Sequence, residues 1–425
     1  MSFIYLEVYR IIYPFCLFLA KLCAPLNTKL KKGLKMREDR NRVPPWLNFT
    51  NMENPILIHC ASGEFEYAKP LIREIRKKNP QQAIVVTYFS PSFESQIKNT
   101  EGVTFACPLP WDLPYVQREF LAKLKPKMIL ISRTDFWPEF LYQAKAMKIP
   151  VCLFSAMLSS YSSKITNPFL KSYYRWLHTL ISHVYCVSED DKNNLAQLTT
   201  PQKITVIGDT RFDQAIYRIS KSSFLKDGLL AKKSERLNSV FIAGSTWPED
   251  EREILPVFKE LLRNTIQVII APHEPTEEHI AKLKKQITDM GIRPLLYSEA
   301  TSWPPNQVLI IDQVGILADL YAWADWAFVG GSFKKQVHSV MEPLAQGCKT
   351  FFGPYYGNNR EAIIFANINH YATPVPSGAQ MLKHILDNRN MDTSTSFKEG
   401  LKETVKAKAG ASEKLAQIVT KPTFN

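Results

Sequence analysis

The chain has 425 residues, too many for one ordinary hydrophobic core, and this length suits two domains of about 150–200 residues each. Hydrophobic residues make up 45% of the sequence, which is close to the globular average and indicates neither a disordered chain nor a polytopic membrane protein. The net charge of +13 implies an anionic partner, which is a nucleic acid, an anionic membrane surface or a phosphorylated substrate.

The positive charge is concentrated at the N-terminus. Residues 1–42 hold nine Lys or Arg residues and three Asp or Glu residues, so a tenth of the chain carries a net charge of +6. This distribution argues against a general nucleic-acid groove and favours a local basic segment, and no nucleic-acid-binding signature occurs in the sequence.

Residues 3–23, FIYLEVYRIIYPFCLFLAKLC, are mostly apolar but contain Glu7, Arg10 and Pro14. A secretory signal peptide carries its positive charge first, and the order here is the reverse. A membrane span needs about 20 clean apolar residues. We therefore predict a helix that lies in, or dips into, a membrane; a buried first helix of the N-terminal domain is the alternative. The basic residues expected on anionic headgroups are Lys29, Lys31, Lys32, Lys35, Arg37, Arg40 and Arg42.

From about residue 55, apolar runs rich in β-branched residues alternate with charged stretches of helical spacing, which predicts parallel sheets with crossover helices. The pattern restarts after a polar stretch at 209–236. The predicted strands are 56–60, 83–89, 128–132, 151–155, 184–188 and 204–208, then 239–244, 267–272, 307–312, 326–331 and 349–353. The predicted helices include 68–78, 140–148, 252–263, 277–291 and one long helix at 398–420.

This pattern predicts an α/β protein with two Rossmann-like domains and a hinge near 209–225. Ligands of open parallel sheets bind at the carboxyl ends of the strands, so a cleft between two such domains is the expected site. The predicted divisions are a membrane anchor and basic tail (1–42), an N-terminal acceptor domain (43–208), a C-terminal donor domain (209–397), and a C-terminal helix (398–425) that returns to the N-terminal domain.

Two carboxylates follow predicted strands of the first domain. Glu64 stands behind Ser62 and Gly63 in a tight loop that leads into a helix, and Asp135 precedes Phe136-Trp137-Pro138 after another strand. A first-turn glutamate that stabilises the helix dipole is the plain alternative for Glu64. Together the two carboxylates suggest group transfer from a nucleotide donor, with one of them taking a proton from an acceptor hydroxyl.

The second domain offers loops suited to a nucleotide. Gly330-Gly331-Ser332 leaves a strand where a backbone can approach a phosphate. His338 and Glu342 have the spacing of one helix face; a metal pair or a helix cap are the alternatives. The seven cysteines are scattered without a CxxC pair, so we expect neither disulfides nor a zinc site, and a reducing cytosol fits.

The motifs CASGEF (60–65), TYFSP (87–91), TDFWP (134–138), GDTRFD (208–213), AGST (243–246), FVGGSF (328–333), HSVMEP (338–343) and FFGP (351–354) occur in this order. In this order the sequence resembles the 3-deoxy-D-manno-octulosonic acid (Kdo) transferases. The resemblance implies an inverting glycosyltransferase of the GT-B type that moves Kdo from CMP-Kdo to a lipid A precursor at the cytoplasmic face of the inner membrane. We expect no cofactor besides the donor substrate, no metal, because no third ligand is near His338 and Glu342, and no nucleic-acid partner.

The resemblance also implies roles for individual residues. Glu64 corresponds to the family's catalytic base, Asp135 joins it as a catalytic residue, and Ser62, Gly63 and Arg133 are placed at the acceptor. The residues expected to bind the donor are Arg211, Gly244, Ser245, Thr246, His273, Gly330, Gly331, Ser332, His338, Glu342 and Asn358.

The sequence departs from the family pattern at several positions. The family commonly has one more residue between Ser62 and Gly63, has an acidic residue at Arg133, and has an arginine at His273, where His273 or Arg211 is expected to replace it. The family's asparagine after the histidine is Ser339 here. Two other functions stay open: a transferase of the same architecture with a different nucleotide sugar and a lipid or glycan acceptor, and a non-catalytic, membrane-tethered nucleotide- or lipid-binding protein.

Overall fold

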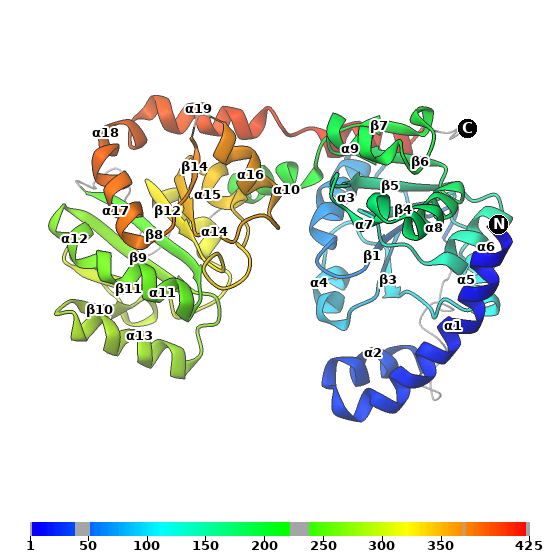
Figure 1. Cartoon of the computed structure of the whole chain (residues 1–425), viewed down its shortest axis with the longest axis horizontal. Coiled ribbons are helices and arrows are strands. Elements are labelled where there is room, and N and C mark those ends of the chain that lie inside the picture. The colour runs from blue at the N-terminus through cyan, green and yellow to red at the C-terminus, as the bar shows by residue number, and fades with distance from the viewer. Residues whose placement is uncertain (1, 39–51, 222–237, 369, 422–425) are drawn as a thin grey trace. The chain divides into compact units, whose positions relative to one another are not determined.

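The computed structural model describes residues 2–38, 52–221, 238–368 and 370–421 (Figure 1). The chain divides into two units. Unit 1 comprises Met1–Gln214 and Ala409–Asn425, and unit 2 comprises Ala215–Lys408. The division falls inside helix α10 (Thr210–Lys221), so the first part of the predicted polar hinge is helical.

Unit 1 is built on a parallel sheet with the strand order β3-β2-β1-β4-β5-β6-β7. Residues on β1 alternate between two cores, because successive side chains of a strand point to opposite faces. Leu57 packs in the core that includes Phe120 and Phe140, and Ile58 packs in the core that includes Leu71. The strands are β1 (Ile56–Cys60), β2 (Ile84–Tyr88), β3 (Phe105–Pro108), β4 (Met128–Ser132), β5 (Val151–Ala156), β6 (His183–Cys186) and β7 (Ile204–Val206).

Helices cover both faces of this sheet, which buries the strands on both sides and explains their continuous apolar sequence. Helices α5 and α6 contribute to the first core, and α3 and α20 to the second. The helices of unit 1 are α1 (Ser2–Cys23), α2 (Thr28–Glu38), α3 (Phe65–Lys78), α4 (Glu94–Lys98), α5 (Pro114–Leu124), α6 (Pro138–Ala146), α7 (Ser163–Thr166), α8 (Pro168–Thr179), α9 (Glu189–Leu195) and α20 (Ala411–Val419).

Unit 2 repeats this architecture with the parallel strand order β10-β11-β9-β8-β12-β13-β14. Its strands are β8 (Ser239–Thr246), β9 (Ile266–Pro272), β10 (Arg293–Leu296), β11 (Gln307–Ile310), β12 (Trp326–Val329), β13 (Lys349–Phe352) and β14 (Ala372–Pro374). Its helices are α11 (Pro248–Ile254), α12 (Phe258–Arg263), α13 (Glu277–Asp289), α14 (Leu317–Leu320), α15 (Met341–Ala345), α16 (Arg360–Asn367), α17 (Gly378–Asp387), α18 (Arg389–Asp392) and α19 (Thr395–Lys406). The prediction of two parallel-sheet α/β domains is therefore confirmed.

The structure differs from the sequence prediction in five elements: three strands were not predicted, and two predicted helices are each divided in two. The sequence did not predict β3, β10 and β14, which are the edge strands at three of the four sheet ends. The predicted helix at 252–263 is interrupted near Pro256, between α11 and α12. The predicted helix at 398–420 is two helices, α19 and α20, because Gly410 adopts a left-handed conformation with φ 98° that breaks the helix between them.

Helix α1 is fastened to unit 1 along one face. Tyr5 donates a hydrogen bond to Ser172 (2.7 Å), and Tyr9 donates one to the buried Asp112 (2.8 Å). Arg10 forms two hydrogen bonds with the buried Glu139, at 2.9 and 3.0 Å. These contacts explain why charges stand inside an apolar sequence: they hold the helix on the domain.

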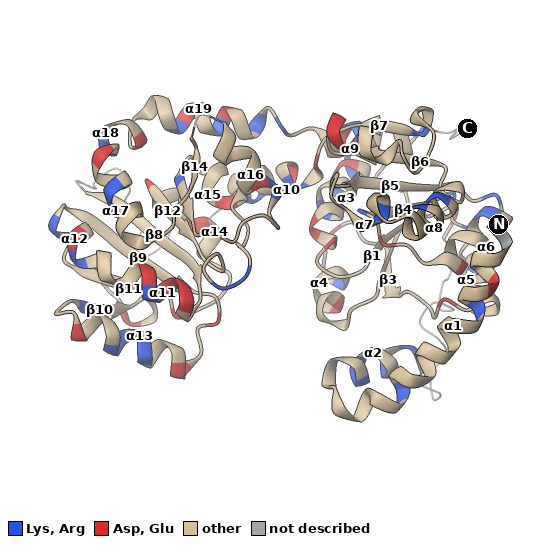
Figure 2. Cartoon of the chain, in the orientation of Figure 1, with Lys and Arg blue, Asp and Glu red and all other residues tan. Residues whose placement is uncertain are grey.

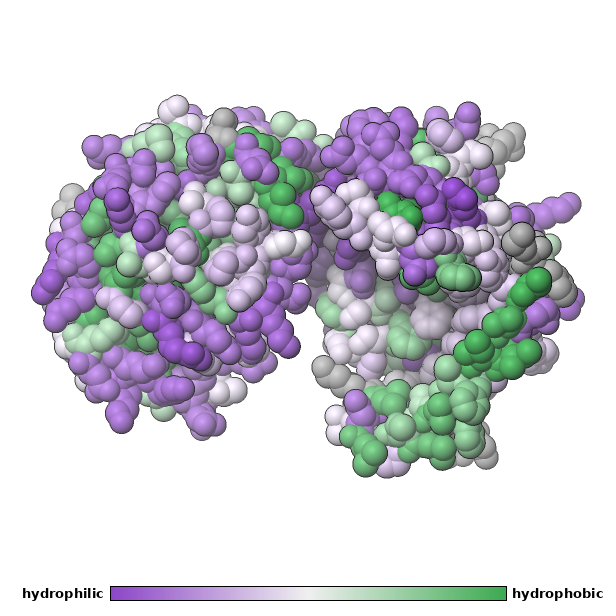
Figure 3. All heavy atoms as spheres, in the orientation of Figure 1, coloured by the Kyte–Doolittle hydropathy of each residue, from purple (hydrophilic) through white to green (hydrophobic). Residues whose placement is uncertain are grey.

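The other face of α1 is apolar and exposed, and it forms a continuous hydrophobic band in Figure 3. Its residues recur every three or four positions, the spacing of one helix face. No helix in the described part of the chain is both long and apolar enough to cross a membrane. The exposed residues are Ile4, Val8, Ile11, Ile12, Phe15, Phe18, Leu19 and Leu22.

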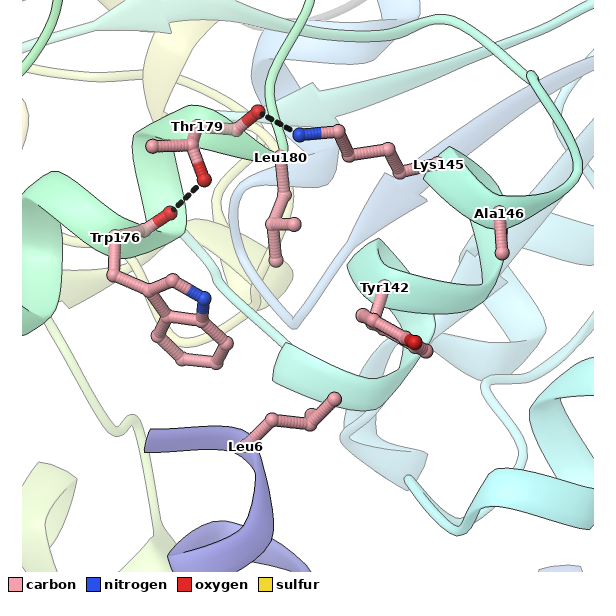
Figure 4. Close-up of a pocket in the computed structure, with 7 residues that line it drawn as sticks. All are labelled: Leu6, Tyr142, Lys145, Ala146, Trp176, Thr179 and Leu180. Atoms are coloured by element: carbon pink, nitrogen blue, oxygen red, sulfur yellow. Dashed lines mark hydrogen bonds between the residues drawn. The ribbon is translucent and has the colours of Figure 1, made fainter. Parts of the chain in front are cut away.

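A hollow of about 300 Å³ lies where α1 meets α6 and α8 (Figure 4). Leu6 approaches it from α1, Tyr142 from α6 and Trp176 from α8. The ammonium group of Lys145 donates to the main-chain oxygen of Thr179 (2.9 Å) and so ties α6 to α8 beside the hollow.

Helix α2 carries the basic residues that follow α1 (Figure 2), but they do not all face solvent. Lys31, Lys32 and Lys35 are exposed. Arg37 is only 6% exposed and donates hydrogen bonds to the main-chain oxygens of Leu109 and Phe89. The prediction that Arg37 faces headgroups is therefore wrong, because it links α2 to the sheet. Arg40 and Arg42 lie outside the described residues.

Candidate active site

The loop between β1 and α3 places Glu64 at the carboxyl edge of the unit 1 sheet. The Glu64 carboxylate accepts a hydrogen bond from the main-chain nitrogen of Ser62 (3.0 Å), and its carbonyl accepts one from the hydroxyl of Ser132 (3.1 Å). Glu64 occupies the N-cap position of α3, but its side chain caps none of the helix N–H groups. Glu64 is partly exposed, and its main chain is held against the end of β4 by the Ser132 hydroxyl.

Asp135 is held by two side chains that donate from different elements. His59, a fully buried residue of β1, lies 2.8 Å from Asp135 Oδ2 through Nε2, and its Nδ1 lies 3.0 Å from the Thr87 hydroxyl. The indole nitrogen of Trp137 donates to the same Asp135 oxygen (3.0 Å). Burial alone would raise the pKa of Asp135, but the hydrogen bonds from His59 and Trp137 and the charge of Lys164 lower it. Asp135 is therefore ionised at neutral pH.

The two predicted carboxylates share one neighbourhood. They follow β1 and β4, which pair in the centre of the sheet. Burial raises the pKa of the Cys60 thiol, and the negative charges of Glu64 and Asp135 raise it further, so both carboxylates lie near this thiol. The structure thus brings together the two residues that the sequence proposed as catalytic.

An aromatic cluster connects Asp135 with α1 and α2. The Trp137 ring stacks on Phe89 at 4.8 Å and meets Tyr13 of α1 edge-on at 6.4 Å. The Arg37 guanidinium of α2 lies over the rings of Phe89 and Trp111, at 4.6 and 4.9 Å. The N-terminal helices therefore contact the same cluster that positions Asp135.

Two cationic side chains lie over the ring of Tyr67, which is three residues after Glu64. Arg133 is exposed, and its guanidinium lies 5.7 Å from the centre of the Tyr67 ring. Arg211 lies 4.6 Å from the same ring and pairs with Asp209 (2.9 Å). The sequence assigned Arg211 to the donor in the second domain, but this residue belongs to unit 1 and lies on the Tyr67 side of the Glu64 loop.

In unit 2 the glycine-rich loop after β12 is held mainly by its own neighbours. A Cβ on Gly330 would lie 2.2 Å from the Ser245 carbonyl, so only glycine fits there. The carboxylate of Asp250 accepts hydrogen bonds from the N–H groups of Gly331 (2.7 Å) and Phe333 (2.9 Å). Ser332 is fully buried, and its hydroxyl donates to the Val329 carbonyl. These groups stabilise the loop, and the Ser332 hydroxyl does so from inside it, where it also accepts a hydrogen bond from the N–H of Gly353 (2.7 Å).

Three aromatic rings that are exposed or partly exposed stack on one another in unit 2. His273 after β9 lies 4.2 Å from His338 and 4.9 Å from Trp247, measured between ring centres. The indole N–H of Trp247 donates to Nε2 of His338 (2.9 Å), so this nitrogen is unprotonated. Burial, His273 and Lys334 lower the pKa of His338 to about 4. The Lys334 ammonium lies 3.5 Å above the Trp247 ring.

The predicted shared helix face of His338 and Glu342 is wrong. Helix α15 begins at Met341, so His338 lies in the preceding loop, where its ring joins the stack. Glu342 instead accepts a hydrogen bond from Arg218 (3.1 Å). Asn358 donates to the Val337 carbonyl (3.3 Å) and supports the loop that carries His338.

The remaining predicted donor residues lie at the end of β8. Gly244 is buried, and Ser245 adopts a left-handed conformation with φ 55°. Thr246 is fully buried and donates to Glu251 (3.0 Å), which also contacts His279. In the described part of the chain, no three His, Cys, Asp or Glu side chains gather where they could hold a metal ion.

Comparison with known proteins establishes the family to which the chain belongs. The sequence profile described as 3-Deoxy-D-manno-octulosonic-acid transferase (kdotransferase) matches residues 33–214. A 3-deoxy-D-manno-octulosonic acid transferase of Chlamydia muridarum (strain MoPn / Nigg) is 30% identical over 319 residues, which are 71% of this chain and 71% of that relative. The chain belongs to the Kdo transferase family.

Other relatives agree with this membership. A 3-deoxy-D-manno-octulosonic acid transferase of Rickettsia bellii (strain RML369-C) is 28% identical over 381 residues, 86% of this chain and 87% of that one. The crystal structure of a UDP-GlcNAc 2-epimerase from Neisseria meningitidis matches with a TM-score of 0.58, at 16% identity, over 86% of this chain and 97% of that chain. The similarity to the epimerase concerns the fold alone. The prediction of an enzyme of the glycosyltransferase class is confirmed by the family.

In this Kdo transferase family member, motifs that are far apart in sequence lie at the carboxyl ends of strands. CASGEF, TYFSP and TDFWP follow or end β1, β2 and β4 of unit 1, and AGST and FVGGSF do so for β8 and β12 of unit 2. The physical reason is that all strands of a parallel sheet end at the same edge.

Sequence reasoning missed several residues of these sites. His59 had a signal, because it is a polar residue inside the buried strand ILIHC. Trp247 and Lys334 flank predicted motifs, but nothing in the local sequence shows that they meet. Tyr67 belongs to the site because the Arg133 guanidinium lies over its ring, and Lys164 because it donates a hydrogen bond to Thr134.

Proposed function

We propose that this protein moves Kdo from CMP-Kdo to a lipid A precursor with inversion at the anomeric carbon, and that Glu64 is the general base. The observation that carries the proposal is the placement of Glu64 in a family member: a partly exposed carboxylate at the carboxyl edge of the sheet, not used as a helix cap. Family membership supports Kdo transfer as the reaction.

In the proposed step, a Glu64 carboxylate oxygen takes the proton of an acceptor hydroxyl. The oxygen of that hydroxyl forms a bond to the anomeric carbon of Kdo, while the bond from this carbon to the CMP phosphate breaks. CMP leaves with the bonding electrons from the opposite face, and Glu64 later returns its proton to solvent. Asp135 follows β4, the strand that pairs with the β1 strand before Glu64, and its charge adds to the negative potential at this edge of the sheet.

The ring stack of unit 2 supports the donor side of the proposal. Trp247, His273 and His338 offer the faces and edges of rings to a nucleobase, and Lys334 supplies a positive charge for a phosphate. His273 stands where the family has an arginine, and Lys334 over the Trp247 ring brings a positive charge to the same stack.

The amphipathic α1 supports a membrane location. We propose that the protein lies on the cytoplasmic face of the inner membrane, with the apolar face of α1 in the interface and Lys31, Lys32 and Lys35 of α2 near anionic headgroups. The contacts of Tyr5, Tyr9 and Arg10 would then hold the domain against the bilayer that contains the acceptor.

The test uses the full chain with CMP-Kdo and a tetra-acylated lipid A precursor in mixed micelles, with products identified by mass spectrometry. We expect the acceptor to gain the mass of at least one Kdo residue. UDP- and GDP-sugars offered in parallel should give no product. Product from one of these donors but not from CMP-Kdo would establish a different transferase, and CMP binding without transfer to any acceptor would establish a binding protein.

A further inference from the structure

Different kinds of side chain follow the individual strands at the carboxyl edge of the unit 1 sheet. Aromatic side chains, with Phe89 and Trp111 among them, follow β2 and β3 on the side of α1 and α2. The carboxylates Glu64 and Asp135 follow the central strands β1 and β4. Two cations share this edge: Arg133 also follows β4, and Lys164 follows β5. A ligand on this edge therefore meets aromatic surface, carboxylates and positive charge along one row of strand ends.

The Lys164 ammonium lies beside the loop that carries Arg133, because it donates a hydrogen bond to the next residue, Thr134. Burial lowers the pKa of Lys164, Arg133 lowers it further, and Asp135 opposes this effect. The Lys164 ammonium donates to the hydroxyl of Thr134 (3.2 Å), next to Arg133 in sequence, and lies 4.8 Å from the centre of the Tyr174 ring. Within the described residues, no carboxylate lies within ion-pair distance of either cation.

The backbone of Arg133 adds a second observation. Its φ is 63°, a left-handed conformation that is strained for a residue with a side chain. This turn exposes the guanidinium at the strand end, above the Tyr67 ring that it shares with Arg211. Like-charge repulsion between Arg133 and Lys164 disfavours the free state, and a bound anion would relieve it.

We propose that Arg133 and Lys164 form the binding site for a phosphate monoester of the acceptor. The inference rests on the proposed function and makes it more specific. A phosphate has several oxygens, so it can contact Arg133 after β4 and Lys164 of α7 at the same time. A guanidinium can bind two of these oxygens in a bidentate manner. The acceptor would then lie along the edge with its phosphate toward β5, its reacting hydroxyl at Glu64, and its acyl chains toward α1 and the aromatic cluster.

The test compares two acceptors: the tetra-acylated lipid A precursor, and the same lipid after phosphatase treatment. Each is assayed with the parent protein, Arg133→Gln, Lys164→Gln, the double variant and Lys171→Gln. Lys171 is the matched control, because Lys171→Gln removes one charge on neighbouring α8, where the Lys171 ammonium donates a hydrogen bond to the exposed side chain of Gln197 (2.8 Å). The readout is the ratio of kcat/KM for the phosphorylated and the dephosphorylated acceptor.

We expect the parent and Lys171→Gln to prefer the phosphorylated lipid. Each single variant should lower this preference roughly tenfold, and the double variant should bring the ratio close to one. The site is refuted if the double variant keeps the parental ratio, or if the variants raise KM for CMP-Kdo in place of changing the ratio. The latter result would assign the cations to the donor.

A binding measurement separates this inference from the proposed function. Retention of each protein by micelles with the phosphorylated or dephosphorylated lipid needs no donor and no turnover. If the parent transfers no Kdo, the proposed function fails, while a phosphate preference in binding that the double variant lacks still supports the site. Equal binding of both lipids by the parent refutes the site. Unfolding curves of all variants verify that the fold is retained.

Discussion

Arg37 of α2 is expected to stabilise unit 1, although its sequence context is that of an exposed basic segment. Its guanidinium donates to the carbonyls of Leu109 (2.7 Å) and Phe89 (3.0 Å), with longer contacts to Tyr88 and Gly33. The substitution Arg37→Gln removes these bonds and the stacking on two aromatic rings. Lys35→Gln is the matched control, because Lys35 lies on the same helix and is exposed.

The magnitude follows from opposing contributions. Two short hydrogen bonds from a charged donor contribute about 3–6 kcal/mol. Burial lowers the pKa of Arg37 to about 10, from an ordinary value of 12.5, which corresponds to a cost of roughly 3 kcal/mol for the buried charge. The cation–π contacts with Phe89 and Trp111 add about 1–2 kcal/mol. The net loss on substitution is about 3 kcal/mol.

Thermal unfolding and hydrogen exchange measure this loss. For a unit of this size, about 3 kcal/mol lowers the Tm of unit 1 by roughly 6–12 °C if α2 unfolds together with the sheet. If α2 detaches first, exchange of the amides of residues 28–38 should accelerate by about two orders of magnitude. Lys35→Gln should change neither quantity. If Arg37→Gln and Lys35→Gln behave alike in both measurements, the reasoning about the buried guanidinium is refuted.

Glu64→Gln should lower turnover by about 10²–10⁴-fold without changing CMP affinity, and near-parental turnover would return Glu64 to a structural role. Trp247→Ala should weaken CMP binding in calorimetry about tenfold, because it removes a stacking face worth about 1–3 kcal/mol; unchanged affinity would place the nucleotide elsewhere. Replacing Phe15 and Phe18 of α1 by Ser should reduce flotation with anionic vesicles at least tenfold while leaving the unfolding curve unchanged. Burial lowers the pKa of His178 to about 4, whereas an unfolded histidine titrates near 6.5. Stability should therefore fall as the pH drops from about 6.5 to about 4, and His178→Asn should flatten this part of the stability profile.

The internal strands could be predicted from the sequence, and most edge strands could not. Internal strands such as ILIHC are buried on both faces, so their composition is continuously apolar. The three missed strands are short edge strands, and each contains a proline: Pro108, Pro294 and Pro374. Proline cannot donate to a sheet ladder, so an edge strand tolerates it, and the local pattern then resembles a loop.

The candidate site shows the same division. Glu64 and Asp135 could be proposed because each follows an apolar strand, and strand ends of a parallel sheet converge. The partner of Asp135 could not be predicted, because His59 lies 76 residues away and its role depends on which strands pair. The placement of His338 outside a helix likewise depends on the stack with His273 and Trp247, which no local pattern encodes.

The sequence by itself determined the two parallel-sheet units and the loops that carry the chemistry, because burial period, strand composition and chain order are local properties. Only the tertiary structure decided which charges serve the fold and which face solvent. Arg37 and Lys35 lie two residues apart in one basic helix, yet one binds carbonyls inside unit 1 and the other faces solvent. The direction of a side chain on a helix, and the groups that it meets there, depend on how that helix packs against distant strands.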